Sequence, residues 1–385
     1  MSKKTAAAII AVVLALVAVH NFRRAYPEIT WPIITSSLSE PESPSSNGSP
    51  YKFYYDNLTV TEKQAYNMIL DKIYDMPDKI LVPDLNEEEL DNVFSALLSD
   101  NPDLFFLGRK CSVKAELWND FFSVDYIIEK EDYEKQKAEL DAACDKVIAS
   151  LTNRNSQYQT ELEIHNYIID HCSYKIEKKN FVYSSAYGCL VNGVAACEGY
   201  SKAAKLLFDR VGIESALISG TATTSKEAGG AHMWNIVNID GSYYHLDCTW
   251  DDPVTNGKNM RLYTYFNLSD EAIGKTHFNF SIDPGCVSTG ANYYEKISLT
   301  FPNYSSADNS KLKETIVNQY KAGERQIQIN FANEKSYKSA ISSLIDKSEI
   351  YNVLKGAKIN GKTVWDKFEG YYDNKDTYTL TLVFK

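Results

Sequence analysis

The pair Asp240-Gly241 stands between two apolar runs, 231–239 and 242–250. A two-residue Asp-Gly loop favours a tight β-hairpin, because both central residues of such a loop need a positive φ. The loop also sets the register, since the residues on either side of it must pair with each other. The sequence therefore predicts two neighbouring antiparallel strands whose residue-by-residue pairing follows from the numbering.

Two reactive residues lie on this hairpin. In the predicted register His232 faces Thr249, and Trp234 faces Asp247. His232 and Asp247 are then diagonal neighbours on one face of the sheet, about 7–8 Å apart at the backbone. A carboxylate at that separation can accept a hydrogen bond from the imidazole and fix its tautomer. The other ring nitrogen is then available to act as a base.

Cys197 is the predicted nucleophile for that base. It begins an expected helix over 197–211, and the positive end of a helix dipole stabilises a thiolate. Glu198 opposes this effect with an adjacent negative charge, so a base is still needed. We therefore predict a Cys-His-Asp triad. His232 takes the thiol proton, the sulfur attacks an amide carbonyl, and water or an amine resolves the thioester.

Further groups are expected to line the site. The backbone N–H of Cys197, at the helix start, is a predicted donor to the oxyanion. Tyr187 and Trp234 are predicted to add a wall or a hydrogen-bond donor for the substrate.

No metal or cofactor is predicted. His165, His171 and Cys172 could supply metal ligands, but His165 and His171 are six positions apart, which is poor spacing for one helix face. The other reactive residues that we interpret as structural are His245 in a strand, His277 in a loop, and Asp251 and Asp252 in a turn before Pro253.

Several segments of this central region resemble a known family. Residues 188–193 and 196–203 resemble the nucleophile motif of the transglutaminase-like superfamily, 231–237 its histidine strand and 245–253 its aspartate strand. The resemblance covers roughly residues 155–285. It implies a papain-like Cys-His-Asp triad, with the nucleophile helix packed on an antiparallel sheet. It also implies activity as a peptidase, an amidase or a protein-crosslinking transamidase.

The N-terminus indicates export. Two lysines precede an apolar or small run over 5–19, and two arginines follow it. Residues 1–24 are therefore interpreted as an uncleaved signal anchor or as a cleaved signal peptide. The Ser/Pro-rich composition of 25–52 predicts a flexible linker. Both interpretations place the rest of the chain outside the cytoplasm.

The remainder is expected to form three parts. Residues 53–154 are predicted to be mostly helical, 155–285 to form the transglutaminase-like catalytic core, and 286–385 to form a small α/β module. The predicted fold class is α+β, with a papain-like core between the two flanking regions.

Composition excludes some functions. The net charge of −11 gives no positive field for nucleic acid. Seven cysteines are too few for a disulfide scaffold, and their odd number leaves at least one without a partner in the chain. We predict a membrane-anchored cysteine enzyme that acts on amide bonds of proteins or peptides in the cell envelope. The alternative is a non-catalytic surface or scaffold protein. The substrate, the oligomeric state and the choice between hydrolysis and transamidation stay open.

Overall fold

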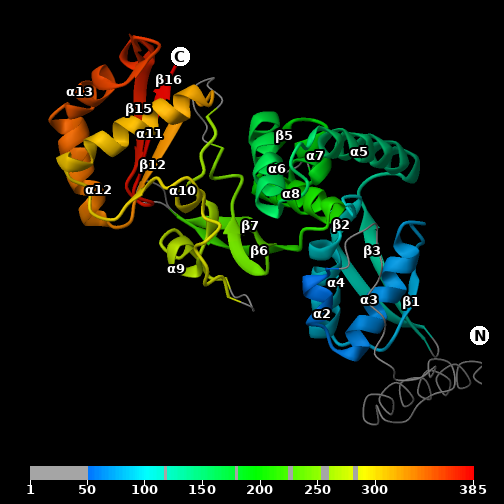
Figure 1. Ribbon diagram of the computed structural model, residues 1–385. Coiled ribbons are helices and arrows are strands. Elements are labelled where there is room, and N and C mark those ends of the chain that lie inside the picture. Colours follow the sequence, from blue (N-terminus) through cyan, green and yellow to red (C-terminus); the bar gives the residue numbers. More distant parts are fainter. Residues whose placement is uncertain (1–50, 117–118, 178–180, 224–228, 253–259, 281–284) are drawn as a thin grey trace, which may run out of the picture. The chain divides into compact units, whose positions relative to one another are not determined.

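The computed structural model describes residues 51–116, 119–177, 181–223, 229–252, 260–280 and 285–385 (Figure 1). The predicted signal segment 1–24 and all but the last two residues of the predicted linker 25–52 lie outside these ranges. Within the described ranges, no helix combines the length and the apolar character needed to cross a membrane. The chain divides into one unit up to Ala138 and a second over Glu139–Lys385. The domain boundaries expected from the sequence stay predictions.

The first unit combines helices with a small antiparallel sheet of order β1-β3-β2. Its elements are α2 (Phe53–Asp56), α3 (Val60–Ile73), β1 (Ile80–Val82), α4 (Glu87–Asp100), β2 (Leu107–Glu116) and β3 (Asn119–Tyr126). Helix α3 begins with a capping box of Thr59 and Glu62, and α4 begins with one of Asn86 and Glu89. In each box two backbone N–H groups that the helix leaves unpaired are satisfied, which defines the helix start.

Helices of the second unit precede its main sheet in the chain. They are α5 (Lys130–Ser150), α6 (Gln157–His171), α7 (Ala186–Leu190) and α8 (Cys197–Val211). Helix α5 runs across the division between the units. Between the helices lie a 3-10 turn at Phe181–Ser184 and two short strands that pair with each other, β4 (Ser173–Tyr174) and β5 (Val194–Ala195). Helix α8 has the predicted bounds. It ends at Gly212, whose φ of 74° is the left-handed conformation that closes a helix.

The main sheet has the strand order β10-β6-β7-β8-β9, and all its neighbours are antiparallel. The strands are β6 (Ser215–Ala222), β7 (Gly230–Ile239), β8 (Ser242–Leu246), β9 (Phe266–Leu268) and β10 (His277–Phe278). Ile239 pairs with Ser242, so the predicted hairpin register is confirmed. The second strand is shorter than predicted. It ends at Leu246 because the Asp247 carboxylate accepts hydrogen bonds from the backbone two and three residues onward and turns the chain.

Helix α8 packs on strands β6 and β7 (Figure 1). The Ser201 hydroxyl in α8 donates to the carbonyl of Met233 in β7 at 2.9 Å, and the Asn235 amide in β7 donates to the carbonyl of Ser201 at 3.0 Å. Lys205, fully buried, donates to the carbonyl of Ser215 in β6. The helix that begins at Cys197 thus packs on an antiparallel sheet, and the predicted α+β, papain-like class is confirmed.

The C-terminal elements combine helices and short strands with a four-stranded sheet of order β11-β12-β16-β15. They are β11 (Thr300–Phe301), α11 (Asn309–Lys321), β12 (Gln326–Phe331), α12 (Glu334–Ala340), α13 (Glu349–Gly356), β13 (Lys358–Ile359), β14 (Lys362–Thr363), β15 (Phe368–Asn374) and β16 (Thr379–Phe384). Before them lie the short helices α9 (Asp270–Ile273) and α10 (Tyr293–Lys296). Helices α11, α12 and α13 and the sheet share one apolar core, as an α/β module requires.

Candidate active site

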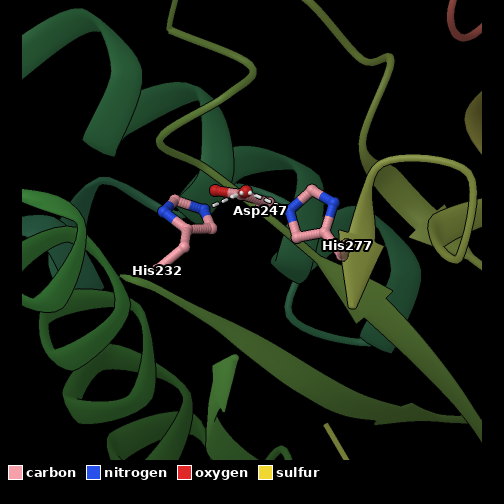
Figure 2. A group of neighbouring side chains, drawn as sticks. All are labelled: His232, Asp247 and His277. Atoms are coloured by element: carbon pink, nitrogen blue, oxygen red, sulfur yellow. Dashed lines mark hydrogen bonds and ion pairs between the residues drawn. The ribbon is translucent and has the colours of Figure 1, made fainter. Parts of the chain in front are cut away.

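His232 and Asp247 form a direct buried pair (Figure 2). His232 lies near the start of β7, and Asp247 follows the last residue of β8. The Nε2 atom of His232 is 2.7 Å from Oδ2 of Asp247. The structure therefore brings together the two side chains that the hairpin register predicted to be diagonal neighbours.

The Asp247 carboxylate has four donors. Its Oδ1 accepts the backbone N–H groups of Thr249 at 2.9 Å and Trp250 at 3.2 Å, and its Oδ2 faces Nε2 of His232 and, at 3.1 Å, Nε2 of His277. Burial raises the pKa of Asp247, but the two histidines outweigh burial and hold this pKa below its usual range. Asp247 is therefore ionised, and both histidine nitrogens that face it must carry protons.

Cys197 interacts with the imidazole of this pair. It is the first residue of α8, it is partly exposed, and the preceding Ala196 provides no side chain that caps the helix. Burial lowers the pKa of His232, but attraction to Asp247, the hydrogen bond with Asp247 and the interaction with Cys197 outweigh burial and raise this pKa to about 10. Cys197, His232 and Asp247 thus form one interacting line, in which a cationic imidazole is hydrogen-bonded to the carboxylate.

His277 is the residue that sequence reasoning missed. We interpreted it as an ordinary loop residue, but it lies in the edge strand β10 and pairs with Ala222 of β6. Figure 2 shows the rings of His232 and His277 on opposite sides of the Asp247 carboxylate. Its spacing in the sequence contains no signal for this position, because the position depends on which strand of the sheet β10 joins.

The predicted substrate-facing role of Trp234 is wrong. Its side chain is fully buried, and its indole N–H donates to Nδ1 of His245 at 2.9 Å. Residues 232 and 234 share one face of β7, so the indole lies beside the His232 ring, with 6.0 Å between ring centres and an angle of 18°. Trp234 therefore supports the imidazole and does not contact substrate.

Tyr187 lies in α7, and its hydroxyl donates to Oε2 of Glu139 at 2.6 Å. Burial and Glu139 together raise the pKa of Tyr187 to about 12. The proton that we expected to serve the substrate is thus used within the protein. A role for Tyr187 as a wall of the site stays a prediction.

Gly220 of β6 lets the indole of Trp234 and strand β10 approach each other. A Cβ atom at position 220 would be 2.6 Å from the carbonyl oxygen of Phe278 and 2.7 Å from Cη2 of Trp234. We expect Gly220→Ala to lower the free energy of unfolding by about 1–3 kcal/mol, because neither the backbone nor the buried indole can easily move away. Urea denaturation measures this change. Gly230→Ala in β7 is the control, since no atom lies within 4 Å of its Cβ position. Equal stability of the two variants would contradict the expected close contact.

Among the residues that the structure describes, two side-chain groups have the composition of metal sites: His232, Asp247 and His277, and His245, Asp270 and Cys286. In the first group both nitrogens that face the carboxylate are N–H donors. In the second group Nδ1 of His245 accepts the Trp234 N–H, so Nε2 carries the proton and donates to Asp270 at 2.8 Å. A metal ion needs a lone pair from each of these nitrogens. In this hydrogen-bonded state the residues do not offer one, and the expectation of no metal stays a prediction.

Asp251 and His165 form another buried pair, distinct from the site. Nε2 of His165 is 3.1 Å from Oδ2 of Asp251, and Oδ1 of Asp251 accepts the N–H of Tyr265 at 2.8 Å. Burial raises the pKa of Asp251 well above its ordinary value and lowers the pKa of His165 to about 3. Burial thus disfavours the charged form of each group. This supports the structural interpretation of Asp251 in the turn after β8.

The site lies in a segment that is similar to a known family. Residues 145–248 match the family model of the Transglutaminase-like superfamily, which confirms the resemblance predicted from the motifs. The matched segment contains Cys197, His232 and Asp247 and ends before His277.

Two solved structures are similar to part of the chain. One is a crystal structure of a TGase, with 15% identity and a TM-score of 0.28, covering 46% of this chain and 51% of that chain. The other is a protein of Cytophaga hutchinsonii proposed to be a cysteine protease, with 9% identity and a TM-score of 0.24, covering 40% of this chain and 64% of that chain. This chain thus spans less than two thirds of either one, and similarities this distant do not extend to activity. None of the curated proteins compared with the chain matches it.

Proposed function

We propose that the protein is a cysteine enzyme that transfers the acyl group of an amide bond through a thioester on Cys197. The observation that carries this proposal is the His232 imidazole, which is hydrogen-bonded to Asp247 and whose pKa is raised by Asp247 and Cys197 together. Members of the transglutaminase-like superfamily are commonly cysteine proteases or transglutaminases, which supports the same chemistry. The line supplies a nucleophile, a base and a group that orients the base.

The reaction follows from the positions of the protons. The Asp247 carboxylate holds Nε2–H of His232, so Nδ1 carries the proton that came from the thiol, and the sulfur of this thiolate–imidazolium pair attacks the carbonyl carbon. Backbone N–H groups at the start of α8, where no side chain caps the helix, support the oxyanion. When the C–N bond breaks, His232 returns the proton to the leaving amine. Water or a second amine then attacks the thioester, gives its proton to His232, and releases the thiolate.

The proposal also includes a location outside the cytoplasm and a substrate found there. The apolar run over 5–19, flanked by lysines and arginines, supports an extracytoplasmic protein that is anchored in the membrane or secreted. We therefore propose a protein or peptide of the cell envelope as substrate.

The rate of Cys197 alkylation tests the proposed nucleophile. Of the seven cysteines, only Cys111 and Cys197 are not buried. Burial and Asp91 raise the pKa of Cys111 to about 11, so Cys111 is a slowly reacting internal reference. Because the His232 imidazolium interacts with Cys197 and favours a nucleophilic sulfur, we expect iodoacetamide to modify Cys197 faster at neutral pH than it modifies free cysteine. Peptide mass spectrometry follows both residues in one sample. A rate at Cys197 no higher than that of free cysteine would favour the non-catalytic scaffold.

A further inference from the structure

We propose that His277 is a positioning residue for the Cys197–His232–Asp247 line. Its Nε2 is 3.1 Å from the same Oδ2 of Asp247 that holds His232 (Figure 2). In this role His277 keeps the Asp247 carboxylate directed at His232. The relevance of this role to turnover rests on the proposed function, but the effect on His232 itself does not.

The protonation state of His277 follows from its two partners. Asp247 is ionised and only accepts, so Nε2 of His277 carries a proton. Its Nδ1 is 2.9 Å from the hydroxyl of Thr276, which is closer than the 3.3 Å from that hydroxyl to the carbonyl of Ile273. Burial lowers the pKa of His277, so the ring is neutral, and Nδ1 accepts the Thr276 proton. His277 therefore gives Asp247 an N–H donor and adds no second positive charge beside His232.

The ring of His277 is held rigidly. It is buried against Trp234 and Trp250, with ring centres 4.8 Å and 4.7 Å away. The titratable groups near it are Asp247, His232, Tyr265 and His245. Among these, Asp247 alone shares a hydrogen bond with the imidazole. The N–H donor is thus fixed by packing on two indoles and by the Thr276 hydroxyl.

The hydrogen bond from His277 limits rotation of the Asp247 carboxylate. Two backbone N–H groups hold Oδ1 of Asp247, and two imidazoles hold Oδ2. Without His277, Oδ2 keeps only His232 as a partner, and the carboxylate can rotate so that Oδ2 no longer points directly at Nε2 of His232. The positive charge on His232 would then lose part of its stabilisation. His277 thus acts on the base of the proposed triad through Asp247.

Titration of His232 measures this effect without any substrate. His277→Leu removes the N–H donor and fills its place with an apolar side chain. We expect this variant to lower the midpoint of His232 titration from about 10 by about one pH unit, a tenfold change in the protonation equilibrium of His232. His277→Gln places an amide N–H near the same position and should restore most of the midpoint. Nuclear magnetic resonance of the imidazole carbons is practical, because the chain has 6 histidines. His171→Gln, at a ring bonded to the carbonyl of Leu190, is the control and should change nothing.

The outcomes of these titrations test the positioning role of His277 separately from the proposed function of Cys197. An unchanged His232 midpoint in His277→Leu, even with a lower melting temperature, would overturn the positioning role and leave His277 as a packing residue. Failure of the glutamine variant to restore the midpoint would also count against an N–H donor. If the His232 midpoint falls as expected while Cys197 of the unmodified protein alkylates like a free thiol, the positioning of Asp247 stands and the proposed function fails.

Discussion

Cys197→Ala is expected to abolish turnover of every amide substrate, a loss of about 10⁶-fold in kcat if the triad acts as one unit. The alanine side chain cannot form a thioester, and Cys197 is the cysteine whose interaction with His232 raises the pKa of that imidazole. A peptide library incubated with a labelled primary amine detects both outcomes of the reaction, because mass spectrometry reports cleaved peptides and peptides that carry the amine. The same measurement on intact protein shows whether an acyl group remains attached to Cys197.

Cys111→Ala is the matched control, since it removes the other cysteine that is not buried. We expect this variant to keep full turnover and the Cys197→Ala variant to keep its circular dichroism spectrum. Full activity in folded Cys197→Ala protein would contradict the assignment of the nucleophile. Loss of activity in both variants would indicate that the thiols matter for stability and not for chemistry.

The part of the site that could be predicted is the part that local geometry determines. Asp240 has a φ of 52° and Gly241 a φ of 85°, as the loop requires, and these two residues set the register of β7 and β8. Strand alternation then places His232 and Asp247 on one face. The position of Cys197 depended on the start and end signals of a single helix, which are also local.

The parts that could not be predicted depend on contacts between distant segments. His277 reaches Asp247 because β10 joins the edge of the sheet beside β6, and no pattern within two residues of His277 specifies that partner. Trp234 shows a different limit of prediction from the sequence. Alternation correctly places it on the same face as His232, but the rings of His277 and Phe280, with centres 4.8 Å and 5.2 Å away, cover it and exclude substrate. The face of a residue was predictable, whereas its exposure was not.

Asp247→Asn is expected to lower kcat by about 10⁴-fold, the cost of the same change in an equivalent triad. Two backbone N–H groups face Oδ1 and two imidazole N–H groups face Oδ2, so all four directions around the carboxylate require an acceptor. An amide supplies only one oxygen. If its oxygen faces the backbone, its NH₂ group faces His232 and forces the proton onto Nδ1, the nitrogen that must accept the thiol proton. Loss of the negative charge also lowers the pKa of His232 from about 10, so the alkaline limit of activity moves to lower pH.

Asp251→Asn provides a control with the same substitution four residues away. Burial favours the protonated form of Asp251, and an amide resembles a protonated carboxyl, because its oxygen can accept the Tyr265 N–H while its NH₂ donates to His165. This variant should therefore keep its stability and its turnover. The pH–rate profiles of the two variants separate a charged carboxylate that directs a base from a neutral one that fills the core. Equal losses of activity in both variants, or an unchanged rate in Asp247→Asn, would contradict the role of Asp247 in orienting His232.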